Sequence, residues 1–97
     1  MVETVHIVLN DFGRLGLVLV ETDPARADPE TIVRNMLTGQ YDQPIRVDAY
    51  NVAAGTAHDA SGEIARLIAQ RCPDLGPVTY GVRAFCERNG VWIPEAA

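Results

Sequence analysis

Hydrophobic residues are concentrated in three short segments whose pattern is typical of β-strands. Residues 4–10 and 15–20 are rich in Val, Ile and Leu, and the glycine-containing segment 11–14 between them predicts a β-hairpin. Residues 45–50 alternate regularly, so that apolar side chains share one face and polar ones the other. The second segment is apolar on both faces, which predicts a strand that is covered on both sides.

Three further segments have apolar residues at helical spacing. Asp28 is a suitable N-cap for the first helix, with Pro29 in its first turn and Gly39 just beyond its end. Asp59 is the N-cap candidate of the second helix, and a segment with two prolines separates that helix from the third. The expected helices cover residues 29–38, 59–71 and 77–88.

The order of these elements predicts a single α+β domain over residues 1–97, with residues 91–97 as a short C-terminal tail. The order is ββαβαα, and the first helix can return the chain so that the third strand pairs with the first. We therefore expect a three-stranded antiparallel sheet of order 2-1-3, with the helices packed mainly on one face. That face should be the one that carries Val5, Ile7, Leu9 and the leucines of the second strand.

The opposite face would then be too apolar to remain bare. Its side chains are those of His6, Val8, Val18, Val20, Arg46, Asp48 and Tyr50. Either the third helix and Trp92 fold over it, or a second subunit packs against it. The second alternative predicts a homodimer interface made by Val8, Val18, Val20, Tyr50 and Trp92.

Charge and composition narrow the possible partners. The net charge is −5, and all eight basic residues are Arg, so the clustered positive charge that nucleic acids and anionic membranes attract is missing. The absence of Lys excludes Schiff-base chemistry and a P-loop. Cys72 and Cys86 match no metal or redox spacing and are expected to be thiols in the core. Neither a secretory signal nor a membrane-spanning segment is evident, so we expect a cytoplasmic protein.

The predicted loop between the third strand and the second helix carries the most varied polar residues. Its helix N-terminus could hold an anion or a small polar ligand, with His58 moving a proton. The ligand-binding candidates are Asn51, Thr56, His58 and Ser61. The alternative is structural, because Asp59 would cap the helix and Asn51 would satisfy the backbone of the loop.

Other matches to known sites are incomplete, and we expect neither a metal nor a cofactor. Asp11-Phe12-Gly13 lacks every companion motif of a kinase. The carboxylates of Glu21, Asp23, Asp28 and Glu30 lack the spacing and the glycine of a calcium loop. His6 and His58 are too few to define a zinc site.

Several short motifs are distributed along the chain, at residues 11–16, 21–23, 39–41 with Pro44, 49–51, 59–61 and 64–65. Together they resemble a family of small alphaproteobacterial proteins without an assigned function. The resemblance implies an intracellular bacterial protein and no particular chemistry. Thr56 stands where the family has an aromatic residue.

These observations predict a small intracellular protein that is a non-enzymatic interaction or oligomerisation module. Its partner would be a second copy or another protein. The alternative is a small enzyme, or a protein that binds an anion or polar ligand, using the strand-to-helix loop 51–61.

Overall fold

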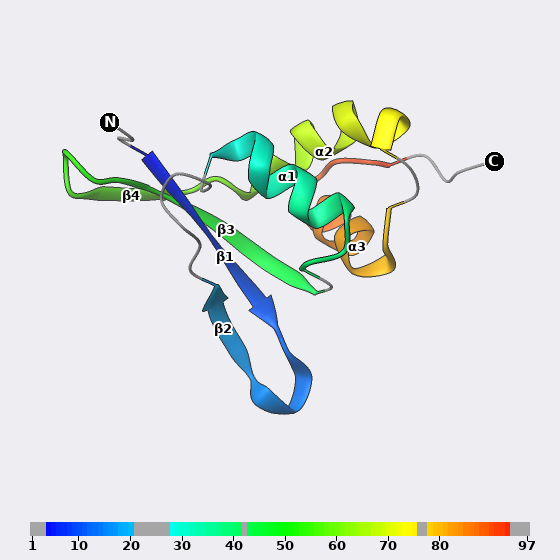
Figure 1. Cartoon of the computed structure of the whole chain (residues 1–97), viewed down its shortest axis with the longest axis horizontal. Helices are drawn as coiled ribbons and strands as arrows, with labels where there is room; N and C mark the ends of the chain where they lie inside the picture. The colour runs from blue at the N-terminus through cyan, green and yellow to red at the C-terminus, as the bar shows by residue number, and fades with distance from the viewer. Residues whose placement is uncertain (1–3, 21–27, 42, 76–77, 94–97) are drawn as a thin grey trace.

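The computed structural model describes residues 4–20, 28–41, 43–75 and 78–93 (Figure 1). Four strands and three helices follow one another in the order ββαββαα, with a 3₁₀ turn at Gly13–Leu15 inside the first hairpin. The strands are β1 (Thr4–Asp11), β2 (Leu17–Val20), β3 (Pro44–Asn51) and β4 (Thr56–Asp59). The helices are α1 (Pro29–Leu37), α2 (Ser61–Leu75) and α3 (Tyr80–Arg88).

The sheet is antiparallel throughout and has the order β2-β1-β3-β4. The α+β class and the pairing of the first three strands are confirmed, but the prediction of three strands was wrong. The turn after β3 is stabilised by the Asn51 side chain, whose Oδ1 accepts from the Ala54 amide at 3.0 Å. Gly55, at φ 68°, lets the chain double back into β4. All four residues of β4 are exposed, so no hydrophobic alternation marks this strand in the sequence.

The helices begin where local capping allows. Asp28 caps α1, since its Oδ2 accepts from the Thr31 amide at 3.1 Å, as expected. Helix α2 begins at Ser61 and not at Asp59, because Asp59 belongs to β4. Helix α3 begins at Tyr80 after the N-cap Thr79, three residues later than expected.

For β1 and β2, the helices cover the face that the pattern assigned to the outside, whereas β3 buries Val47 and Ala49 as expected. Val8 on β1 pairs with Val20 on β2 and with Val47 on β3, and all three pack into the core. Asn10, also fully buried, accepts at Oδ1 from the Gln43 amide at 3.1 Å. The predicted orientation of the first two strands was therefore reversed. Both faces of these strands are apolar, so the alternation of side chains along them does not indicate which face is buried.

The core lies between this face and the helices. Its largest fully buried side chains include Ile32 and Met36 of α1, Ile64 of α2 and Phe85 of α3. After α3 the chain adds Ile93 to the core, so the predicted tail is packed at this point, whereas residues 94–97 lie outside the described part.

Cys72 and Cys86 are buried free thiols, as expected. Burial raises the pKa of Cys86 to about 12. Within the described residues, no helix has the length and apolar character that crossing a membrane requires.

Candidate functional site

The face of the sheet that points away from the helices has no covering element among the described residues. It is formed by alternate side chains of the four strands, as the register shows: Leu9 pairs with Leu19 and with Arg46, and Tyr50 pairs with Val5 and with Ala57. We call this surface the open face. Its residues are Val5, Ile7, Leu9, Asp11, Leu17, Leu19, Arg46, Asp48, Tyr50, Ala57 and Asp59.

The open face is apolar over β1 and β2. Leu17 is 59% exposed and Leu19 is 47% exposed, and the apolar side chains of β1 on this face are partly exposed. Figure 1 shows that the β1–β2 hairpin extends away from the three helices, so the helices leave its leucines uncovered. Contiguous exposed apolar surface of this kind marks interaction sites in soluble proteins.

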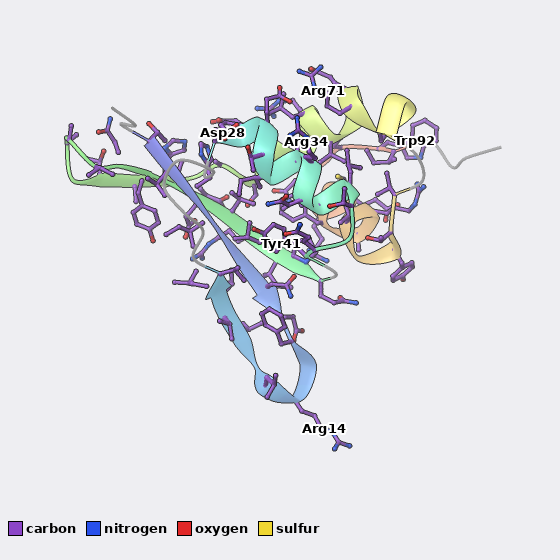
Figure 2. The ribbon with its side chains drawn as sticks, viewed as in Figure 1. Arg14, Asp28, Arg34, Tyr41, Arg71 and Trp92 are labelled. Carbon is purple, nitrogen blue, oxygen red and sulfur yellow. The ribbon has the colours of Figure 1, made fainter. Side chains whose placement is uncertain are left out.

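Strand β2 is an edge strand that is exposed on both faces. Val18, on the side of the helices, is 43% exposed, so the expectation that this strand is covered on both sides was wrong. The strand contains neither a charged residue nor a proline, the usual protection of an edge. The hairpin tip adds exposed Phe12 and Leu15, and Arg14 extends from it into solvent (Figure 2).

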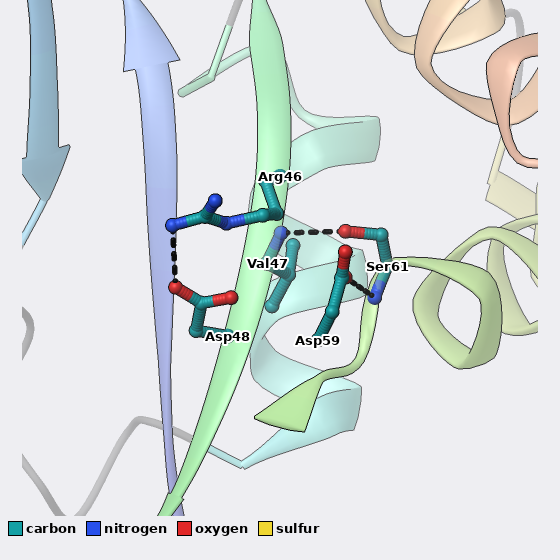
Figure 3. A network of polar contacts seen from close by, with 5 residues as sticks. All are labelled: Arg46, Val47, Asp48, Asp59 and Ser61. Carbon is teal, nitrogen blue, oxygen red and sulfur yellow. Dashed lines mark hydrogen bonds and ion pairs between the residues drawn. The ribbon is translucent and has the colours of Figure 1, made fainter. Parts of the chain in front are cut away.

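A pair of opposite charges lies on the inner strand β3 of the open face. Arg46 Nη2 lies 2.9 Å from Asp48 Oδ2 (Figure 3), with the side chains 47% and 16% exposed. Their neighbours on β1 are apolar, because Leu9 pairs with Arg46 and Ile7 pairs with Asp48. The charges therefore lie beside the apolar side chains and not at a distant edge.

The four ligand-binding candidates of the 51–61 segment do not converge. Ser61 is buried, and its Oγ accepts from the Val47 amide at 2.9 Å, while Asn51 Oδ1 holds the β3–β4 turn. Thr56 and His58 are exposed on β4, where His58 Nε2 lies 3.6 Å from Glu63 Oε1. The contact of Asn51 is structural, as the alternative interpretation of this segment expected, and that of Ser61, for which it made no prediction, is structural as well.

Asp59 also has a structural contact, with the first residue of α2. Its Oδ1 accepts from the Ser61 amide at 2.8 Å (Figure 3). Hydrogen bonding from Ser61 lowers the pKa of Asp59, burial opposes this, and the charges of Arg46 and His58 lower it further.

The predicted interface residues are dispersed over the molecule. Val8 has no exposed surface and Val20 packs against the core, so neither is on the open face. Val18 faces the side of the helices, and Trp92 is 75% exposed at the C-terminal end of the helical layer (Figure 2). Tyr50 alone of the five belongs to the open face. The leucines of β2 were missed as surface residues because they were assigned to the core.

The described part of the chain gives little support for a site that binds a metal or a small molecule. It contains no group of three or more residues that could hold a metal, and Glu21 and Asp23 lie outside it. A shallow depression of about 370 Å³ lies at the base of the hairpin tip. It is lined by Asp11, Phe12, Gly13 and Gln43, and the Asp11 carboxylate already accepts from the Gly13 amide at 2.8 Å.

Comparison of the chain with protein-family models, with curated proteins and with solved structures finds no match. The site is therefore interpreted from its own geometry.

Proposed function

We propose that this protein is a non-enzymatic association module in which two copies pack through their open faces. The observation that carries the proposal is the exposed apolar surface of Leu17 and Leu19 beside the partly exposed side chains of β1. Removing such surface from water is the main driving force of protein association. Stacking of two antiparallel sheets is also a common way to bury one apolar face against another.

The size of the open face suits a small dimer interface. Its strands have eight, four, eight and four residues, and at about 3.3 Å per residue and about 4.8 Å between strands they cover roughly 380 Å². Side chains that protrude from the face have a larger accessible area than this projection. A standard interface buries about 800 Å² on each partner, so the open face belongs to the smaller and weaker class of interfaces.

Charge disfavours a nucleic acid as the partner of the open face. The chain has a net charge of −5, and the one basic residue of the open face, Arg46, is paired with Asp48. Asp11 and Asp59 add two further carboxylates to this face, so its charge is predominantly negative.

Solution mass measurement tests this proposal. We expect the wild-type chain to sediment with twice its mass of 10.5 kDa at micromolar concentrations, and the Leu17→Ser/Leu19→Ser variant to be a folded monomer. The matched control is Tyr80→Ser/Trp92→Ser, which removes two exposed aromatic side chains from the helical part of the molecule and should leave the dimer intact.

A monomeric wild-type chain at hundreds of micromolar would contradict the proposal. So would a dimer that persists in the leucine variant, or one that dissociates in the control variant. Circular dichroism of each variant establishes that the fold is retained.

A further inference from the structure

Backbone hydrogen bonds show which residues of β1 direct their backbone groups toward β2. The Asp11 amide donates to the Gln43 carbonyl at 2.9 Å, on the side of β3. The Phe12 amide donates to the Gly16 carbonyl at 3.0 Å, on the side of β2. Backbone groups of successive residues point to opposite sides of an extended strand. The even-numbered residues of β1 therefore bond to β2, and the odd-numbered residues bond to β3.

The side of β2 that points away from β1 is consequently formed by the backbone of Leu17 and Leu19. These residues lie opposite the odd-numbered Asp11 and Leu9, so their N–H and C=O groups point outward. β2 is at one end of the sheet, and no described strand pairs with its outer side. Unpaired strand groups of this kind accept a further strand. The hairpin projects beyond the helices, so the helices leave room for one (Figure 1).

The side chains of β2 favour an occupant that covers both faces of this edge. Val18 is 43% exposed on the side of the helices, while Leu17 and Leu19 are exposed on the open face. Packing of the open faces leaves Val18 in water, whereas a strand beside β2 contacts all three side chains. β2 contains no charged residue. A second β2 strand matches this edge, because it is apolar on both faces and brings no charge that would have to be desolvated.

An antiparallel pair of β2 strands satisfies the edge by symmetry. A two-fold axis perpendicular to the sheet at Val18 places Leu17 opposite the partner's Leu19, and Leu19 opposite the partner's Leu17. Both pairs have outward-pointing backbone groups, so each pair exchanges two hydrogen bonds. Val18 then faces the partner's Val18 as a non-hydrogen-bonded pair, with Cα atoms about 4.5 Å apart. This register uses only residues 16–20, which the structure describes.

The same register brings leucines together and keeps like charges apart. Leu9 pairs with Leu19 in its own sheet, and Leu19 lies beside the partner's Leu17, so three leucines from each chain are contiguous on the joined open faces. Asp11 is separated from the partner's Asp11 by two β2 strands. Two joined open faces project roughly 760 Å², twice the value for one chain, which is close to the area of a standard interface. Edge pairing therefore also enlarges the surface available for packing of open faces.

We propose that β2 pairs with β2 of a second copy, antiparallel about Val18, so that two four-stranded sheets join into one sheet of eight strands. This contact goes beyond the packing of open faces and does not require it. Chains that make both contacts form assemblies larger than a dimer, because each contact uses a different surface of the chain.

Charge at position 18 tests the pairing without altering the open face. In Val18→Lys or Val18→Glu, like charges lie directly opposite one another across the axis. Each variant alone should form the edge pair at least about 10-fold more weakly than the wild type. An equal mixture of the two variants should restore the pair, because opposite charges then face each other. Sedimentation equilibrium at hundreds of micromolar measures the mass, and native mass spectrometry of the mixture measures the fraction of mixed species.

A cysteine at the same position tests the register. Because the Cα spacing of a non-hydrogen-bonded pair suits a disulfide, Val18→Cys should form a covalently linked dimer under mild oxidation. The matched control is Thr56→Cys, on the exposed strand β4 at the other edge of the sheet, which should link at least about 10-fold more slowly. Cys72 and Cys86 are buried, and the wild-type chain measures their background. Circular dichroism establishes that each variant retains the fold.

The outcomes separate the edge pair from the proposed function. Assemblies larger than a dimer that Val18→Lys reduces to a dimer support both contacts. A wild-type dimer that Val18→Lys reduces to a monomer supports the edge pair and contradicts the packing of open faces. A wild-type mass that Val18→Lys leaves unchanged overturns the edge pair and leaves β2 to a strand of another protein. Linkage of Val18→Cys no faster than that of Thr56→Cys overturns it as well.

Discussion

Ser61 connects the sheet to the helical layer through a single hydroxyl group. β4 ends at Asp59, and beyond it the backbone of Val47 is satisfied by the next two residues. The Ala60 amide donates to the Val47 carbonyl at 2.8 Å, and Ser61 Oγ accepts from the Val47 amide at 2.9 Å. The side chain of Ser61 thus continues the hydrogen bonding of β3 at the point where the chain leaves the sheet. Its burial follows from this role.

Replacement of this hydroxyl should therefore destabilise the fold. In Ser61→Ala, the Val47 amide is buried without its acceptor, and we expect a loss of about 1–3 kcal/mol in the free energy of unfolding. Thr56→Ala, at an exposed position of β4, is the control and should change stability by less than about 0.5 kcal/mol. Urea denaturation of both variants measures the difference. Equal stabilities would show that Ser61 has no such role.

At the scale of elements, the junction between β4 and α2 combines a strand end with a helix start. The Asp59 carboxylate accepts from the amide of the first residue of α2, and an anion at this end of a helix is also favoured by the helix dipole. The lowered pKa of Asp59 reflects the same contact with Ser61. The ionised carboxylate is therefore preferred in the folded state over the unfolded one.

This preference predicts a dependence of stability on pH. Because the folded-state pKa of Asp59 lies below 3.8, the ordinary pKa of an aspartate, the unfolded state binds more protons as the pH falls from about 4 toward the folded-state pKa. The contribution of Asp59 is thus present above pH 4 and is lost below it. In Asp59→Asn the free energy of unfolding should decline less between pH 5 and pH 2.5 than in the wild type.

Asp28 and Glu30 retain their own lowered pKa values in that variant, so part of the acid destabilisation will persist. Glu87→Gln removes one exposed negative charge from α3 and is the control. Its free energy of unfolding should decline with falling pH in parallel with that of the wild type. A parallel curve for Asp59→Asn would contradict the prediction.

The whole molecule is elongated, with principal Cα extents of 44, 32 and 22 Å. The hairpin contributes to this shape because it projects beyond the helices (Figure 1). A projecting strand pair with apolar side chains on an uncovered face has few internal contacts of its own. Packing of a second copy would supply them, so the stability of the hairpin and the formation of the dimer should be linked.

Linkage of this kind makes the melting temperature depend on protein concentration. We expect the melting temperature of the wild-type chain to rise by several degrees between about 2 and 200 µM, because mass action favours the folded dimer. Leu17→Ser/Leu19→Ser should melt at a temperature that does not depend on concentration. Differential scanning fluorimetry over this range distinguishes the two. A wild-type melting temperature that is constant would argue against association.

Local signals in the sequence determined the class of the fold and the position of α1. The Asp28 cap, the proline after it and the positive φ of Gly39 at 86° act within a few residues, so they can be read without the rest of the chain. The pairing of β1 with β2 is likewise local, as a hairpin with a glycine-containing turn. β4 was missed because its residues are exposed on both sides and produce no hydrophobic pattern.

The location of the candidate site, on one particular face of the sheet, was decided by the tertiary structure. Both faces of β1 are apolar, and the helices selected the one with Val8 and Asn10, where Val8 packs against Val47 and Asn10 binds the Gln43 amide. The polar segment 51–61, by contrast, is largely occupied by turn and helix-start contacts. The sequence by itself determined that β1 and β2 have apolar side chains on both faces, so that helices on one side of the sheet leave an apolar face uncovered. Only the packing of the helices decided which face this is, because the alternation within a strand is the same whichever side is covered.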